Sequence, residues 1–504
     1  MPTLTSLAAA NDWTAGDLNT DGWIAVVPAY QKVYFADGRE YSATIGDSGY
    51  HKLDCINTSL VGAPSGAFTK GETMTQAVSG ATGVFDETIG AGATAKNLVY
   101  RTSLKEFVTG EIVRGGTSKK NVTPTAVNAP PLWLNWILTT GTFPDGGSNI
   151  MALCGGRIHL NSMYNPHQWF CTRQGNPLDL NTAVDDEQAA DSSQNSIAGI
   201  VGDAITAFIP FKDHYLIFGC AKSMWVRRGD SRQGGTTSNL TYDCGVFSPT
   251  SWCYDDKDNL YWVDLTGFYK LTKEALINGG APENILINSV PNLFKTIQLN
   301  RRTDRVVCGY DRDRHGIVVS ISMLDGSWHC AWFYDILYGS LLPDSYAGTT
   351  IPASILYANS YRGDYRTLLI GGYDGYIRKF DEDTLDDDGT AVGSYVLLGP
   401  INLYQWVRGS GMIDEIEITL GEVTTNCVWS LFAKETAEDI YDAVINAETP
   451  VATGVFSSGG IQTVIKQRIS GKYIGLLLKN ITINKTWETE GIKVHLKISG
   501  KDKE

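Results

Sequence analysis

The feature that most constrains the fold is a series of short apolar strand cores that recurs through residues 150–400. Successive cores start about 45–59 residues apart, and most are followed by a turn and a second strand. Several short strands per repeat of about 40–50 residues are typical of propeller blades, which bury their faces by stacking around a channel. We therefore expect a degenerate β-propeller over 131–400, with five to seven blades. The cores are GGRIHLNS (155–162), HYLIFGC (214–220), NLYWVDL (259–265), GIVVSISM (316–323) and TLLIGGY (367–373).

Turn signals support a mainly β chain. An Asp-Gly pair between alternating apolar residues is a strong hairpin signal, because both turn positions need a positive φ. This pattern predicts hairpins at VYFADGREYS (33–42) and LLIGGYDGYIRKF (368–380).

Helical spacing is convincing only within 433–450, where Pro450 follows the end of the pattern. We expect one apolar face on this helix, made of Ala437, Ile440, Tyr441, Val444 and Ile445.

Three further zones flank the predicted propeller. Residues 1–61 hold strands that we expect to join it. Residues 62–130 are rich in Gly, Thr, Ala and Ser and predict a small inserted β domain. Within it, AFTKGETMTQ (67–76) is echoed 39 residues later by EFVTGEIVRG (106–115), which predicts two related hairpins. Residues 401–504 contain clean alternating strands and predict a C-terminal β-sandwich-like unit, and we expect the final GKDKE to be disordered.

Charge and apolar patterning narrow the function classes. The chain carries 41 Lys and Arg against 55 Asp and Glu, a net charge of −14, which argues against tight general binding to DNA. We find no apolar run that approaches the roughly 18–20 residues of a membrane span. The nine cysteines form no CxxC pair, so we expect buried free thiols and a reducing compartment during folding.

Two acidic segments have a metal-binding alternative. Asp17, Asn19, Asp21 and Gly22 match the first half of a calcium loop, but Pro28 replaces the final bidentate Glu, so a plain turn is the main interpretation. The run DEDTLDDDG (381–389) carries six carboxylates. Its default interpretation is a solvated loop, and a divalent ion is the alternative.

No catalytic constellation emerges. Asp325-Gly326-Ser327-Trp328 only partly matches a sialidase Asp-box. Glycosidases use a pair of catalytic carboxylates, but acidic residues occur throughout the chain, so no such pair can be singled out. We expect structural or interface roles for the pairs Arg227-Arg228 and Arg301-Arg302, and structural roles for His159 and His167. We therefore assign no catalytic, cofactor-binding or metal-ligating residue and expect no enzyme activity.

Ordered motifs over 155–271 resemble a known family. They are a Gly-Arg strand at 156–157, an Asn-Pro-x-x-Trp turn at 165–169, a Gly-Asn-Pro segment at 175–177, a Gly-Asp-x-Ile-Thr stretch at 202–206 and an LIF strand before Trp225 and Gly229-Asp230. CGVFSPTSWCYDDKDNLYWVDLTGFYKL (244–271) continues the likeness, more loosely to 400. GETMTQAVSGATGVF (71–85) looks like a small β insertion of phage structural proteins, and ISGKYIGLLLKN (469–480) with WETEGIKVHLK (487–497) is similar to the family's closing β unit. The family is the tail nozzle, or tail tubular hub, of short-tailed (podovirus-like) phages, related to proteins that stabilise packaged DNA.

This resemblance implies a virion structural protein. Such a nozzle forms a ring, commonly a hexamer, below the portal and adaptor (the head-to-tail connector), and genomic DNA passes through its lumen without sequence-specific binding. The implied location is the virion tail, assembled in the bacterial cytoplasm, and the implied partners are further copies of the chain, the adaptor, and needle, fibre or spike proteins. An acidic conduit would let the duplex slide. We expect 62–130, 181–199 and 341–366 to offer docking surfaces. The alternatives are a propeller that binds host glycans and, third, a propeller glycoside hydrolase.

Overall fold

The computed structural model describes residues 10–498, apart from 12, 21, 184, 289, 325–327, 347–349, 360–361, 364–365, 381–383, 404–410 and 466–468. Some residues used in the sequence predictions therefore lie outside the described residues. They are Asp21, 325–327, 381–383 and the final GKDKE. The chain forms two compact units, Met1–Arg302 and Thr303–Glu504. The division between them falls within 131–400, the range that the sequence assigned to one propeller.

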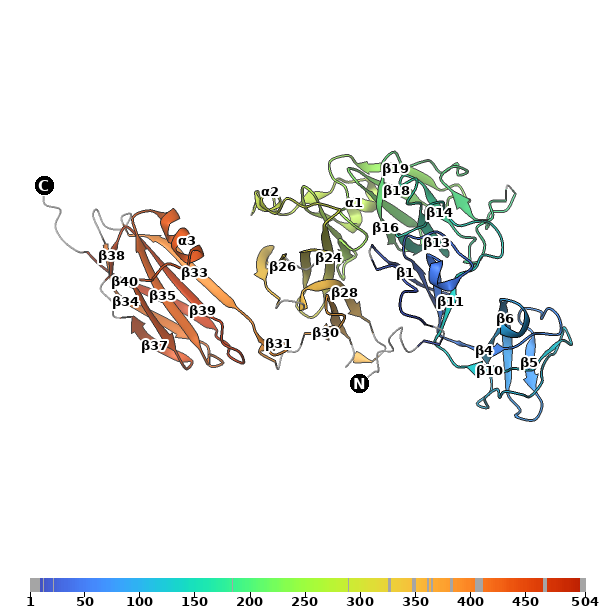
Figure 1. Cartoon of the computed structure of the whole chain (residues 1–504). Coiled ribbons are helices and arrows are strands. Elements are labelled where there is room, and N and C mark those ends of the chain that lie inside the picture. The colour runs from blue at the N-terminus through green and yellow to red at the C-terminus, as the bar shows by residue number, and fades with distance from the viewer. Residues whose placement is uncertain are drawn as a thin grey trace. The chain divides into compact units, whose positions relative to one another are not determined.

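The mainly β prediction is confirmed, and the strands are grouped into blade-like sheets (Figure 1). The first unit contains four sheets of four antiparallel strands, and the second unit continues with a four-stranded and a three-stranded sheet. After the first sheet, the strands of each sheet follow one another in chain order, as in propeller blades. The first four sheets are β1(Ala25–Ala29)–β2(Lys32–Ala36)–β3(Tyr50–Asp54)–β11(Leu132–Asn135), β12(Met151–Cys154)–β13(Arg157–Asn161)–β14(Trp169–Cys171)–β15(Asp191–Ser192), β16(Ile205–Phe211)–β17(Tyr215–Cys220)–β18(Met224–Arg228)–β19(Thr236–Thr241) and β20(Trp252–Tyr254)–β21(Leu260–Asp264)–β22(Gly267–Leu271)–β23(Glu283–Asn284). The fifth and sixth are β24(Asp304–Asp311)–β25(Gly316–Met323)–β26(His329–Asp335)–β27(Ser340–Asp344) and β28(Pro352–Ala358)–β29(Thr367–Gly372)–β30(Ile377–Lys379).

The five strand cores found in the sequence are the second strands of five successive sheets, β13, β17, β21, β25 and β29. A second strand has neighbours on both edges. In the first unit, residues of these strands also pack against the adjacent sheet. Every residue of β13 and of β21 is buried. Burial on both faces explains why β21 (LYWVD) is a nearly continuous apolar run, whereas the buried polar residues of β13, Arg157, His159 and Asn161, are hydrogen-bonded.

Apolar contacts between neighbouring sheets form the core of the first unit. Tyr34 of β2 packs with Ile158 and Leu160 of β13, between the first and second sheets. Trp169 of β14 packs with Phe218 of β17, and Ile217 shares a cluster with Trp262 of β21. Each such buried side chain stabilises the fold by about 1.5–3 kcal/mol. The first strands also follow one another in space, with β12 lying between β1 and β16.

A seven-stranded sheet is inserted into the first blade-like sheet, between β3 and β11 (Figure 1). Its strand order is β10-β4-β7-β6-β5-β8-β9, and we call residues 57–128 the inserted domain. Leu60, Met74, Val99 and Val113 are among the residues of its separate apolar core. The strands are β4(Asn57–Val61), β5(Thr73–Gln76), β6(Thr82–Ile89), β7(Lys96–Arg101), β8(Val113–Gly115), β9(Asn121–Val122) and β10(Ala126–Asn128).

The second unit ends in a β-sandwich, as predicted for the C-terminus. Its two sheets are β33-β39-β35-β36 and β37-β34-β38, with β40 also paired to β34. Ile416 and Ile418 of β34 share a core with Leu431 of β35 and Leu478 of β39. Its elements are β33(Ser394–Asn402), β34(Gly411–Leu420), β35(Cys427–Lys434), α3(Ala437–Ile445), β36(Ala452–Phe456), β37(Gly460–Ile465), β38(Ile469–Gly471), β39(Tyr473–Asn480) and β40(Thr489–Ile498). The other elements among the described residues are α1(Lys273–Asn278), α2(Leu293–Ile297), β31(Asp386–Asp387), β32(Thr390–Ala391) and the short 3-10 helices Ile45–Asp47 and Gly92–Thr94.

One of the two Asp-Gly hairpins is confirmed and the other is wrong. β29 pairs with β30 across the turn that contains Asp374 and Gly375. In contrast, β2 pairs with β3, which starts only at Tyr50. The intervening loop is held by Asp37, whose carboxylate accepts hydrogen bonds from the backbone N–H groups of Asn19 and Arg39, so the chain does not return directly as a second strand.

The helix predicted near residue 440 is confirmed as α3, but its predicted apolar face is partly wrong. Ile440 and Ala443 are buried against the sandwich. Tyr441 is 48% exposed and Ile445 is 79% exposed. The helix packs by a narrower stripe than the sequence pattern indicated, and two large apolar side chains remain on its outer side.

Candidate functional site

The inserted domain is built from the duplicated hairpin that the sequence predicted. In the first copy β5 pairs with β6 and places Met74 opposite Gly83. In the second copy β8 pairs with β9 and places Val113 opposite Val122, which is the same pairing 39 residues later. The two copies join through β5 and β8, which run antiparallel. This pairing confirms the internal repeat.

Each copy of the repeated Gly-Glu pair holds the turn of the other copy. The Glu72 carboxylate accepts hydrogen bonds from the backbone N–H groups of Thr117 (2.9 Å) and Ser118 (2.8 Å), in the turn after β8. The Glu111 carboxylate accepts from the backbone N–H groups of Val78 (2.5 Å) and Ser79 (3.0 Å), in the turn after β5. The two turns are also related by the 39-residue offset. These reciprocal bonds explain why the acid is repeated.

The electrostatics of Glu72 agree with this role. Burial alone would raise the pKa of Glu72, but hydrogen bonds from Ser118 and from the backbone N–H groups of Thr69 and Thr117 lower it below its usual value. Accepted N–H bonds favour the charged carboxylate. Glu72 therefore remains ionised, and its carboxylate is bound by N–H groups of the same domain.

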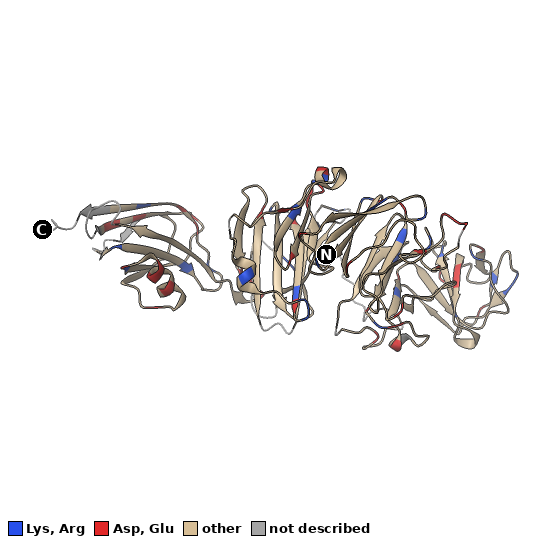
Figure 2. Ribbon diagram, turned by 90° about the horizontal axis from the view of Figure 1, so that it is seen from above, with Lys and Arg blue, Asp and Glu red and all other residues tan. Residues whose placement is uncertain are grey.

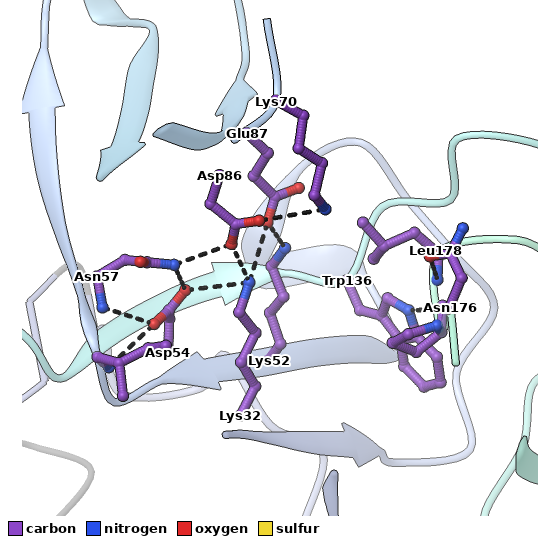
Figure 3. A network of polar contacts seen from close by, with 12 residues as sticks. Lys32, Lys52, Asp54, Asn57, Lys70, Asp86, Glu87, Trp136, Asn176 and Leu178 are labelled. Atoms are coloured by element: carbon purple, nitrogen blue, oxygen red, sulfur yellow. Dashed lines mark hydrogen bonds and ion pairs between the residues drawn. The ribbon is translucent and has the colours of Figure 1, made fainter. Parts of the chain in front are cut away.

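A buried ion cluster joins the inserted domain to the first sheet (Figure 3). The Nζ atom of Lys32, on β2, lies 2.7 Å from a carboxylate oxygen of Asp86 and 3.3 Å from one of Asp54. Lys52, on β3, pairs with Glu87 at 2.5 Å. Asn57 bridges the two sides, because its Nδ2 donates to Asp54 (2.8 Å) and to Asp86 (2.9 Å). We call these residues the junction cluster.

The charges in the junction cluster depend on one another. Burial would lower the pKa of Lys32, but the carboxylates of Glu87, Asp54 and Asp86 raise it above its ordinary value. Burial would raise the pKa of Asp86, but Lys32 and Lys70 lower it to about 2. Burial lowers the pKa of Lys52, and Glu87 only partly offsets this. A groove of about 430 Å³ beside the cluster is lined by Lys32 and Asp86 as well as by Asn176 and Tyr100.

The segment that resembles a calcium loop is held by an arginine. The Arg39 guanidinium pairs with the Asp37 carboxylate (2.6 Å) and donates to the carbonyl oxygens of Gly46 (2.7 Å) and Asp17 (2.5 Å). The Asp17 carboxylate accepts from the backbone N–H of Thr14 (2.9 Å). These contacts support the turn interpretation for the described part of this segment.

The acidic segment before residue 390 is partly paired. Arg378 bridges Asp374 and Asp388, at 2.7 Å from each. The backbone N–H of Gly389 donates to Asp386 at 2.7 Å. Among the residues that the structure describes, no group of three or more His, Cys, Asp or Glu side chains has metal-binding geometry.

Arg227, Arg228, Arg301 and His159 make structural contacts, as expected. Arg227 is buried between the second and third sheets, bonds to His159 (2.5 Å) and stacks over Trp169 at 5.0 Å. Arg228 donates to the Ser238 hydroxyl, and Arg301 donates to the carbonyl oxygen of Ala221 (2.9 Å). His167 lies exposed in the loop between β13 and β14. Burial and the neighbouring Arg227 hold the pKa of His159 well below its usual value, so the imidazole is neutral.

The cysteines are free thiols, as predicted, and only Cys55 is exposed. Burial raises the pKa of Cys154 and of Cys427 to about 11, so neither thiol is poised as a nucleophile. None of the helices that the structure describes has the length and apolar character needed to cross a membrane.

Comparisons with known proteins place the chain in no family. No protein-family model matches it, and neither does any curated protein. The extracellular domain of a B. thetaiotaomicron protein described as a one-component system aligns with 92% of this chain at 11% identity and a TM-score of 0.32, and the chain spans 62% of that structure. Kluyveromyces lactis Hsv2 aligns with 64% of this chain and 98% of its own, at 7% identity and a TM-score of 0.25. Likenesses this low carry no argument about function.

Proposed function

We propose that the chain is a structural subunit of a short-tailed phage tail, a nozzle or hub protein that forms a ring below the adaptor and surrounds the path of the genomic DNA. It has no chemistry of its own in this proposal. Its partners are further copies of the chain, the adaptor and the needle, fibre or spike proteins of the tail.

The observation that carries the proposal is the structural use of the ordered motifs. The Gly-Arg motif leads into β13 of the second sheet, and Gly229-Asp230, the last of the ordered motifs, follows β18 of the third sheet. Arg157 and Asp230, one from each end, form a buried ion pair at 2.7 Å. Arg157 also donates to the backbone carbonyl oxygens of Thr172, Glu187, Gln188 and Ala189. The motif residues therefore hold two sheets together, which supports a structural role for the segment that resembles the tail-nozzle family.

Net charge gives secondary support. A chain with a net charge of −14 repels phosphate, so a ring of such chains would let DNA slide rather than hold it. The charged positions are spread along the ribbon of the whole chain rather than gathered on one sheet (Figure 2).

The test is the mass of the full chain in solution, alone and mixed with the adaptor and the other tail proteins. A ring formed alone, or one formed on the adaptor, is the expected result. A chain that stays monomeric with every tail protein would contradict the proposal. If that monomer also bound or cleaved a polysaccharide, the glycan-binding or hydrolase alternative would replace it.

A further inference from the structure

The inserted domain has an unusually basic surface for this chain. Residues 57–128 carry seven Lys and Arg against five Asp and Glu, a net charge of +2, whereas the whole chain carries −14, which leaves −16 for the rest. Four of the five acids are used internally, Glu72 and Glu111 by the reciprocal turns and Asp86 and Glu87 by the junction cluster. Only Glu106 remains as an exposed acid, 79% exposed. Six of the seven basic residues are exposed, namely Lys70, Arg101, Lys105, Arg114, Lys119 and Lys120. Lys70 pairs with Asp86 and Arg101 pairs with Glu106, so Lys105, Arg114, Lys119 and Lys120 make up the basic surface.

Apolar side chains accompany these charges. On the outer side of the paired strands β5 and β8, Arg114 lies opposite Thr75, and Ile112 is 55% exposed just before β8. Val78, in the turn held by Glu111, is 88% exposed. Phosphate-binding surfaces are dominated by cationic and polar groups, whereas apolar side chains among charges are typical of protein interfaces. This mixture favours an acidic protein surface as the occupant.

The chain itself has a matching acidic and apolar surface on α3. The helix carries Glu438, Asp439 and Asp442 and no basic residue, and these acidic positions stand out on the helix in Figure 2. All three are exposed. They lie beside Tyr441 and Ile445, the two exposed large apolar side chains of α3.

We propose that the basic surface of the inserted domain docks onto the outer face of α3 in a second copy of this chain. The opposite charges set partner and register, and Val78 and Ile112 meet Tyr441 and Ile445. The two surfaces are different parts of the chain, so the contact is heterologous, and a heterologous contact that closes makes a ring. The inference deepens the proposed function, on which it rests for the ring.

A charge-swap experiment on the full chain tests the contact. The first variant reverses three exposed basic residues, as Lys105→Glu, Arg114→Glu and Lys120→Glu. The second reverses the helix, as Glu438→Lys and Asp442→Lys. Each variant alone should self-associate about tenfold or more weakly than the wild type, because several surface pairs become repulsive. An equimolar mixture should regain wild-type association, since each acidic surface then meets a basic one.

The matched control is Lys222→Glu, Lys257→Glu and Lys295→Glu, which changes the net charge by the same amount as the first variant, at exposed positions outside the inserted domain. It should associate like the wild type. Folding of every variant is checked by its thermal transition and circular dichroism.

Three results would overturn the inference: a wild-type chain that stays monomeric, association that neither reversal weakens, or a mixture that does not recover. If both variants still form the ring, the tail proposal stands, because the copies then contact one another through other surfaces. If the first variant loses only binding to random-sequence duplex DNA, the basic surface belongs to DNA and the inference fails.

Discussion

Replacing Lys32 by Met should destabilise the attachment of the inserted domain strongly. The Lys32 side chain is 10% exposed, and its Nζ atom lies within 3.5 Å of carboxylate oxygens of Asp54, Asp86 and Glu87. Met keeps most of the side-chain volume and removes the charge. Breaking a buried ion pair by removing one partner costs about 3–5 kcal/mol, because the other charge remains buried.

The structure favours the lower end of this range. Asp86 keeps Lys70 at 3.2 Å, and Glu87 keeps Lys52 at 2.5 Å. Asp54, whose side chain is fully buried, keeps only hydrogen bonds from Asn57 and from the backbone N–H of Ile56. We therefore expect a loss of about 3 kcal/mol in the free energy of unfolding.

The assay is urea unfolding combined with hydrogen exchange of the β6 and β7 amides. Lys70→Met is the matched control, since it removes the other lysine of Asp86 but its side chain is 73% exposed. The control should lose less than about 1 kcal/mol. Equal, small losses in both variants would refute the idea that the junction cluster secures the domain.

Three further predictions concern the same framework. Acidification should weaken the junction: Asp86 has its pKa lowered from 3.8 to about 2, so its stabilisation is present above pH 4 and is lost as the pH falls toward 2. Unfolding followed between pH 5 and 2 should show this loss in the wild type and less of it in Asp86→Asn. Glu72→Gln should lose about 1.5–3 kcal/mol of stability, because charged acceptors of backbone N–H groups are replaced, whereas Glu106→Gln, at an exposed position, should lose almost none; equal losses would contradict the turn-holding role. Arg157→Met should cost about 3–5 kcal/mol by leaving Asp230 and several carbonyl oxygens without their donor, and a thermal transition unchanged from the wild type would show that this ion pair between the second and third sheets is dispensable.

The fold could be predicted where local pattern and tertiary burial agree. Second strands such as β17 (YLIFGC) and β21 (LYWVD) read as nearly continuous apolar runs because they are buried on both faces, as the fully buried β21 shows. The duplicated hairpin was visible because each Gly-Glu pair must supply both a turn and a carboxylate, and Gly71 and Gly110 do adopt positive φ, at 83° and 79°.

Other features depend on contacts between residues that are far apart in the sequence. β3 pairs with β11 across the whole inserted domain, and no local pattern predicts that partner. Arg39 holds the loop that resembles a calcium site through Asp17 and Gly46, which spacing alone did not indicate. Helical periodicity placed Tyr441 and Ile445 on the buried face of α3, but it cannot tell how wide a stripe the neighbouring sheet covers.

The central claim is that this chain is a ring subunit of a phage tail, and electron microscopy of tails assembled with the full chain tests it most directly. The account predicts a closed ring of copies beneath the adaptor and around the DNA path, present only when the chain is supplied. Complete tails that assemble without the chain, or that carry it only at the tips of fibres, would contradict the account.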